Sequence, residues 1–96
     1  MSHHELERQA VRGEEVARLL ACDAVREVIE EQLASRREAI LGLKAAQTRE
    51  FARIKAGLEA LEELLAALSC VAELGEQARE RLGSAMEGTA TGGRVL

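Results

Sequence analysis

The sequence predicts an all-α protein: a short N-terminal helix, then an antiparallel hairpin of two longer helices, and a flexible C-terminal tail. Ala, Leu, Glu and Arg dominate the 96 residues, proline is absent, and Phe51 is the only aromatic residue. This composition is typical of long helices and coiled coils. Apolar residues recur every three or four positions, which is the helical period, and no stretch alternates as a half-buried strand does.

A chain of 96 residues forms one domain at most and buries a modest core, so its stability often depends on a partner. We divide it into a polar N-terminal segment at 1–13, a helical hairpin domain at 14–83 and a flexible tail at 84–96, rich in Gly, Ser and Thr. No apolar run approaches the roughly 20 residues of a membrane span. The polar start of the chain carries no secretion signal.

The first helix is expected from Glu14 to about Cys22, because acidic residues suit the positive end of the helix dipole and Gly13 weakens a helix before them. Asp23 resembles an N-cap; the alternative is a continuous helix with Asp23 on its surface. The second helix is expected from about residue 24 to 42. Its apolar stripe consists of Val25, Val28, Ile29, Leu33, Ile40 and Leu43, with Ala39 between them.

Residues 43–47 decide between a hairpin and one long helix. Gly42 can end a helix in the left-handed conformation, and Thr48 can cap the next helix, so we predict a tight turn between them. The alternative is an uninterrupted helix of about 60 residues, because the intervening alanines and glutamine favour helix. A hairpin would let the two apolar stripes bury each other.

The third helix carries the most regular pattern and is expected from Thr48 to about Leu74, with Gly75 ending it. Its apolar residues have the three-four spacing of a helix that buries one narrow face against other helices. Small residues follow this stripe and would allow close approach of another helix, including one from a second copy. The stripe, which we call the seam, consists of Phe51, Ile54, Leu58, Leu61, Leu65 and Leu68.

Charge is distributed unevenly along the chain, whose net charge is −4. Residues 36–55, which we call the basic segment, hold six basic and two acidic residues, a balance of +4. Positive charge is mildly unfavourable at the start of a helix. The basic residues Arg49, Arg53 and Lys55, at the start of the third helix, therefore suggest an acidic protein surface or nucleic-acid phosphates as partner. A solvated charged tip is the alternative, and the lack of interleaved aromatics disfavours single-strand stacking. The basic residues are Arg36, Arg37, Lys44, Arg49, Arg53 and Lys55.

No residue pattern identifies an enzyme. The two cysteines, Cys22 and Cys70, have no histidine partner for nucleophilic catalysis. We expect them to be buried or half-buried free thiols in a reducing compartment. His3 and His4 are expected to form a disordered start, because the other ligands of a metal site are missing. The glutamates lie mostly outside the stripes and lack the Glu-x-x-His motif of a di-metal bundle. We therefore expect no catalytic residue, cofactor, metal or small-molecule substrate.

Residues from about 12 to 76 match one pattern without gaps: Arg12-Gly13, Ala17, Leu19-Leu20, Asp23, Glu38-Ala39-Ile40, Thr48, Leu58, Ala60-Leu61, Leu68 and Gly75. In these positions the chain resembles a family of short helical proteins encoded among the head and packaging genes of tailed bacteriophages. It departs from that family in lacking aromatics on the second helix and a Pro/Asp-rich turn at 44–47. The resemblance implies a phage assembly or virion protein and assigns no site.

We therefore expect a non-enzymatic structural or interaction protein, a small phage virion or head-assembly component that acts through helix–helix packing. The seam would bind a second copy of the chain or other phage structural proteins, in the virion or the host cytoplasm. The alternative hypothesis is a small DNA-packaging or nucleic-acid-linked factor. That factor would use the basic residues Arg36, Arg37, Lys44, Arg49 and Arg53.

Overall fold

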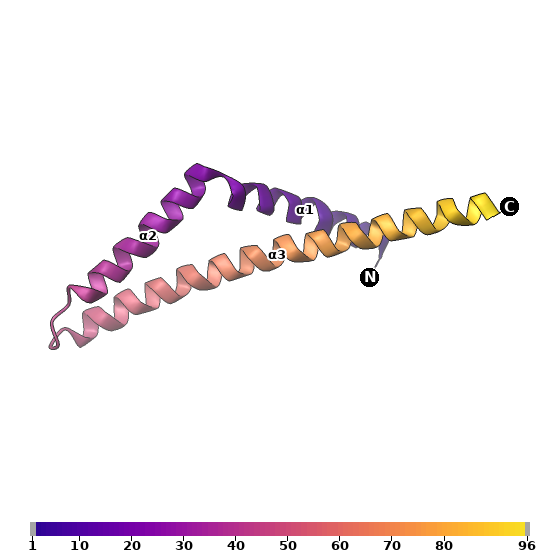
Figure 1. Ribbon diagram of the computed structural model, residues 1–96. Coiled ribbons are helices and arrows are strands. Elements are labelled where there is room, and N and C mark those ends of the chain that lie inside the picture. Colours follow the sequence, from indigo (N-terminus) through magenta and orange to yellow (C-terminus); the bar gives the residue numbers. More distant parts are fainter. Residues whose placement is uncertain (1, 96) are drawn as a thin grey trace. The chain divides into compact units, whose positions relative to one another are not determined.

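The computed structural model describes the backbone of residues 2–95 and the side chains of residues 2–84. Within that range the protein is all-α, as predicted, with no strand (Figure 1). The helices are α1 (His3–Ala21), α2 (Asp23–Leu41) and α3 (Thr48–Val95). None of the helical stretches within the described range is long and apolar enough to cross a membrane.

Contacts divide the chain into two compact units. Unit 1 contains Met1–Arg18 and Leu68–Leu96, and unit 2 contains Leu19–Ala67. Unit 1 therefore combines most of α1 with the second half of α3, whereas unit 2 combines α2 with the first half of α3. In both units, residues far apart in the sequence are in contact.

Helix α1 begins at His3, so the expected start at Glu14 and the disordered start at His3 and His4 are both wrong. The Ser2 hydroxyl oxygen accepts a hydrogen bond of 3.1 Å from the Glu5 N–H, which satisfies one of the free amide donors of the first turn. The Glu5 carboxylate lies in the same turn, where negative charge suits the helix dipole. This cap extends the helix beyond the start that the acidic pair at 14 and 15 predicted.

The break between α1 and α2 is real, so the alternative of a continuous helix is wrong. Cys22 separates the two helices with an extended backbone (φ −69°, ψ 120°), and its carbonyl accepts the first hydrogen bond of α2, from the Arg26 N–H. Cys22 therefore takes the N-cap position that the sequence predicted for Asp23, although it makes no side-chain cap. Asp23 is the first residue of α2, where its charge suits the dipole.

Residues 42–47 connect α2 to α3 without helix, so the alternative of one uninterrupted helix is wrong as well. Gly42 ends α2 in the right-handed region (φ −80°, ψ −7°), not in the predicted left-handed one. Its N–H donates to the Glu38 carbonyl at 3.0 Å, as a continuing helical turn does. The antiparallel hairpin itself stays a prediction.

Gln47, and not Thr48, closes the connection. Its side-chain oxygen accepts from the Lys44 N–H at 2.9 Å, while its own N–H donates to the Lys44 carbonyl at 2.9 Å. The Gln47 carbonyl then accepts from the Phe51 N–H at 3.0 Å, so Gln47 holds the cap position and Thr48 is already helical. The Gln47 side chain thus stabilises the connection itself, which differs from the cap of α3 that the sequence assigned to Thr48.

Helix α3 passes through Gly75, so the expected end of the main helix there is wrong. A glycine inside a helix costs about 1 kcal/mol relative to alanine, and Gly75 offsets that cost through a close contact with α1. The predicted flexible tail at 84–96 lies outside the residues whose side chains are described, except for Ser84.

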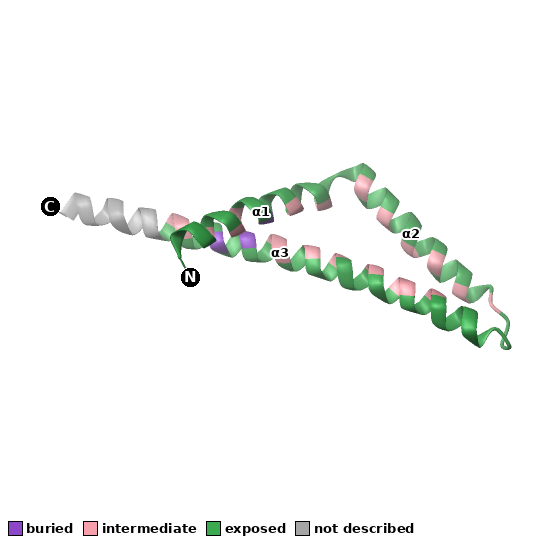
Figure 2. Cartoon of the chain, turned by 180° about the vertical axis from the view of Figure 1, so that it is seen from behind, coloured by how far each residue is buried: buried purple, intermediate pink, exposed green. Residues whose placement is uncertain are grey.

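The best-buried residues are small and lie in unit 1. Gly13 on α1 and Gly75 and Ala78 on α3 are buried (purple in Figure 2). In unit 2 no described residue is more than half-buried. The half-buried residues recur at helical spacing along α2 and α3 (pink in Figure 2). Close helix contact thus rests on glycine and alanine, and the larger apolar side chains stay partly in contact with solvent.

Candidate interaction surfaces

The predicted seam follows one face of α3. Ile54, Leu58, Leu61, Leu65 and Leu68 are all half-buried, whereas Phe51 is 42 % exposed. Full burial of a leucine is worth about 1.5–3 kcal/mol relative to full exposure. A part of that free energy is therefore still unrealised along the seam. That the seam binds a partner stays a prediction.

The stripe predicted on α2 is half-buried in the same way, except for Val28 and Ala39, which are exposed. Val28 is 56 % exposed and does not belong to the face that turns away from solvent. The half-buried positions are Val25, Ile29, Leu33, Arg36, Ile40 and, just after the helix, Leu43. The sequence assigned Val28 correctly to a helix but to the wrong side of it.

Two contacts set the register between α2 and α3 within unit 2. The Arg37 guanidinium lies 3.9 Å from the Glu62 carboxylate. On the other side, Arg36 extends across Gly57, so that a Cβ atom on this glycine would lie 3.7 Å from the Arg36 Nε. Both contacts join the second half of α2 to the first half of α3.

Three of the six basic residues of the basic segment have acidic partners, and two of these partners are local. Arg53 pairs with Glu50 at 2.8 Å, and Lys55 lies 3.9 Å from the Glu59 carboxylate and 5.9 Å from the centre of the Phe51 ring. These pairs, three or four residues apart, give a local reason for positive charge that the sequence reasoning missed. The acidic partner Glu59 lies just outside the segment in sequence.

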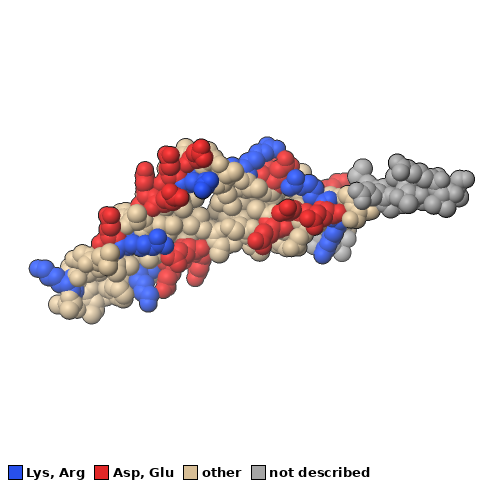
Figure 3. Space-filling view, viewed as in Figure 1, with Lys and Arg blue, Asp and Glu red and all other residues tan. Residues whose placement is uncertain are grey.

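Three basic side chains of this segment form no ion pair within the described part of the chain. Arg36 donates instead to the side-chain oxygen of Gln32 at 2.8 Å and to its carbonyl at 3.3 Å. Lys44 and Arg49 are exposed near the connection. Figure 3 accordingly shows Lys and Arg interspersed with Asp and Glu on the face that it presents, not gathered in one patch.

A contact between two glycines is the feature that the sequence did not predict. A Cβ atom built on Gly13 would lie 2.5 Å from the Gly75 Cα and 2.9 Å from the Val71 carbonyl oxygen. One built on Gly75 would lie 2.5 Å from the Gly13 Cα and 2.8 Å from the Gln9 carbonyl oxygen. The backbones of α1 and α3 therefore touch here, and only glycine fits on either side.

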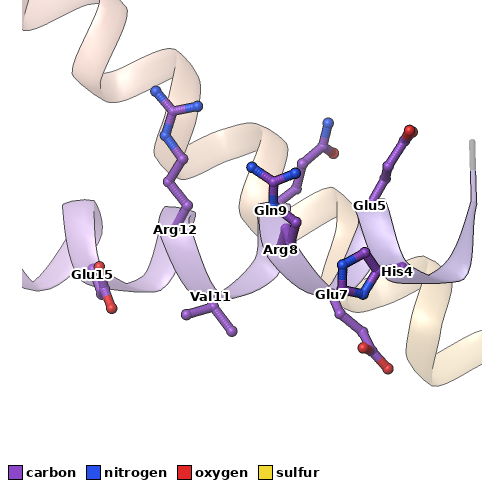
Figure 4. A pocket seen from close by; sticks show the side chains of 8 residues that line it. All are labelled: His4, Glu5, Glu7, Arg8, Gln9, Val11, Arg12 and Glu15. Atoms are coloured by element: carbon purple, nitrogen blue, oxygen red, sulfur yellow. The ribbon is translucent and has the colours of Figure 1, made fainter.

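Neither of the two hollows on the described surface has the make-up of a chemical site. The larger one is open and is lined only by α1, with Arg8 and Arg12 on one side of the helix and Glu7 and Val11 on the other (Figure 4). The smaller one lies over the connection and is lined mainly by apolar and uncharged residues. No group of three potential metal ligands occurs among the described residues.

The two cysteines are free, but both are exposed, so the expected burial of these thiols is wrong. His3 lies 3.0 Å from the Glu7 carboxylate on the next turn of α1. A single helical pair of this kind is a local contact and brings no further ligand or nucleophile with it. The described side chains thus assemble helix-packing surfaces.

No protein-family model, curated protein or solved structure matches the chain. The resemblance to short helical phage proteins therefore stays a prediction. Function has to be inferred from the surfaces themselves.

Proposed function

We propose that this protein is a non-enzymatic helical interaction protein, and that it serves as a small component of a phage particle or of its head assembly. Helices α2 and α3 pair as an antiparallel hairpin along the seam, and the apolar surface that this pairing leaves open binds other helices. The phage assignment rests on the resemblance of residues 12–76. The interaction role rests on the surfaces described above.

One observation carries the interaction role. In unit 2 every large apolar side chain is at best half-buried, and Val28, Phe51 and Leu64 are exposed. A domain of this size that buries so little apolar surface is stabilised when a partner covers the rest. Helices with apolar stripes meet that need most directly with other helices.

The test is sedimentation equilibrium of the full chain, together with thermal unfolding followed by circular dichroism, over about a hundredfold range of concentration. We expect an average mass above 10.4 kDa that rises with concentration. The unfolding temperature should rise with it, because association stabilises only the folded state. A 10.4 kDa species with cooperative, concentration-independent unfolding would refute the proposal.

The alternative function is a nucleic-acid-linked factor, and the unpaired side chains of Lys44 and Arg49 favour it. If only these two contact phosphates, the affinity for DNA should fall with salt with a log–log slope of about −1.8. Reversing Arg49 and Arg53 to glutamate should abolish the binding with helicity unchanged, whereas Arg79→Glu, outside the basic segment, should leave it intact. Absence of DNA binding at low salt would exclude this function.

A further inference from the structure

Helix α3 carries a second apolar stripe beside the seam. Each member stands one residue before a half-buried seam residue, so the stripe is rotated by about 100° around the helix. Arg53, which precedes Ile54, is its one charged member in unit 2, and from Gly57 to Ala67 it keeps the spacing of the seam and contains no charge. Leu64 is 56 % exposed, and the stripe consists of Gly57, Ala60, Leu64 and Ala67.

Helix α2 carries a matching row. Here too each member stands one residue before a half-buried position, and all of its members are exposed. The row contains only small or uncharged side chains, and Val28 is the largest apolar one. It consists of Val28, Gln32, Ser35 and Ala39.

The ion pair between the helices shows that the two rows lie on the same side of the hairpin. Arg37 and Glu62 each stand one residue after a half-buried position, and their side chains meet at 3.9 Å. In an antiparallel pair of helices, the residues that follow the contact face by one position lie on the same side of the pair in both helices. Because the residues that follow the contact face meet on one side, the residues that precede it share the other.

The hairpin therefore has two unlike flanks. The charged flank carries Arg26, Glu30, Arg37, Lys55, Glu59 and Glu62, and its uncharged members are Ala34, Leu41 and Ala66. The apolar flank consists of Val28, Gln32, Ser35, Ala39, Gly57, Ala60, Leu64 and Ala67. The register set by the two inter-helix contacts places Val28 level with Ala67, and Ala39 level with Gly57.

The stripe on α3 already receives a helix farther along. It continues with the same spacing into unit 1, where Val71 is half-buried, Leu74 is 45 % exposed and Ala78 is buried. Gly13 of α1 lies against the Val71 carbonyl. In unit 2 the same kind of surface is uncovered. Small side chains let helix backbones approach closely, as the glycine contact in unit 1 demonstrates.

Charge identifies the occupant of the open part. Within unit 2 the basic segment holds a balance of +4, whereas residues 19–35 and 56–67 hold one basic and seven acidic residues, a balance of −6. A second copy in antiparallel orientation brings each basic segment next to the acidic part of its partner, whereas a parallel copy sets like charges together. The Arg36 guanidinium, held by the neutral Gln32 at the edge of the apolar flank, gains acidic neighbours in the antiparallel arrangement.

We propose that two copies of the chain dock through their apolar flanks, with the hairpins antiparallel, to form a four-helix assembly. This inference rests on the proposed function, because it requires the hairpin. In this arrangement α2 faces α2 of the second copy, so Val28 of one copy lies opposite Ala39 of the other. In a parallel dimer α2 would face α3, and Val28 would lie opposite Ala67.

Disulfide cross-linking distinguishes these arrangements, because a disulfide forms only where the two Cα atoms come within about 7 Å. The full chain carries Cys22→Ser and Cys70→Ser, and single-cysteine variants are unfolded together, refolded as mixtures and oxidised. We expect a mixed disulfide dimer from Val28→Cys with Ala39→Cys, and none from Val28→Cys with Ala67→Cys. Ala66→Cys, an equally exposed alanine away from the apolar flank, serves as the matched control and should not cross-link with Val28→Cys.

Circular dichroism of each variant shows whether the helices are intact, and sedimentation shows whether the variant associates. Cross-linking of the Ala67 pair instead of the Ala39 pair would overturn the antiparallel arrangement. An oligomer that gives no disulfide from any pair on the apolar flank would overturn the use of this flank and leave the proposed function standing. A monomeric chain would overturn both.

Discussion

The close contact between α1 and α3 predicts that Gly13→Ala destabilises unit 1, although alanine favours helix. Carbon atoms in contact lie about 3.5–4.0 Å apart, so a Cβ atom 2.5 Å from the Gly75 Cα is too close by at least about 1 Å. The second neighbour, the Val71 carbonyl oxygen at 2.9 Å, is backbone too. Neither can turn aside as a side chain would, so the helices have to separate.

The net effect of Gly13→Ala on the free energy of unfolding is the difference between a gain in helix propensity and a loss from overpacking. Replacing glycine by alanine inside a helix gains about 1 kcal/mol, and overpacking a tight contact costs about 1–3 kcal/mol. The separation also exposes the buried Ala78. We expect a loss of about 1–2 kcal/mol in the free energy of unfolding, measured by urea denaturation followed by circular dichroism.

Gly83→Ala is the matched control, because it lies in the same helix with no atom within 4 Å of its added Cβ. It should stabilise the protein by up to about 1 kcal/mol. Gly75→Ala should behave like Gly13→Ala, because its Cβ meets the Gly13 Cα at 2.5 Å and the Gln9 carbonyl at 2.8 Å. If Gly13→Ala stabilised the protein as much as Gly83→Ala does, α1 and α3 would not be in contact at these glycines.

Three further substitutions test the remaining contacts by urea denaturation and circular dichroism. Leu61→Ala, at a half-buried seam position, should cost about 2 kcal/mol, and the 85 % exposed Leu41→Ala should change stability by less than about 0.5 kcal/mol; equal effects would contradict the assignment of the seam. Arg37→Ala should cost less than about 1 kcal/mol, and the loss should vanish at high salt, because the pair with Glu62 is exposed. Ser2→Ala should cost about 1 kcal/mol and reduce helicity by fraying the start of α1, whereas an unchanged spectrum would show that the cap contributes nothing.

Local signals in the sequence were enough for α2 and for the beginning of α3. The apolar period predicted a helix over about 24–42, and it spans Asp23–Leu41. The same period placed the seam, because five of its six residues are half-buried. Periodicity reports the buried face of a helix directly, and in these stretches no distant contact overrides it.

The ends of α1 and α3 could not be predicted in this way. Taken alone, Gly13 and Gly75 are weak helix formers, and local propensity predicts a break at each. They are 62 positions apart in the sequence, and only the contact between them makes glycine the suitable residue at both. Local helix propensity cannot predict that a contact between two distant glycines keeps both of them inside helices.

The basic segment was misjudged for a related reason. Its balance of +4 was counted between fixed sequence positions, whereas the acidic partners Glu59 and Glu62 lie one or two turns beyond that boundary or on the facing helix. A helix brings residues three and four apart together, so a charge count needs a margin of a full turn at each end. With that margin the excess positive charge is concentrated at Arg36, Lys44 and Arg49.

In the proposed hairpin, the two unlike flanks explain why association through unit 2 would be directional. Covering the charged flank would remove the Arg37–Glu62 pair and its neighbours from water, and desolvation of such groups costs more than an exposed pair gains. Covering the apolar flank removes Leu64 and Val28 from water and buries no acidic side chain of that flank. Of the two flanks, only the apolar one gains free energy by being covered, and the separated charges of the basic segment and its acidic surroundings then select the antiparallel copy.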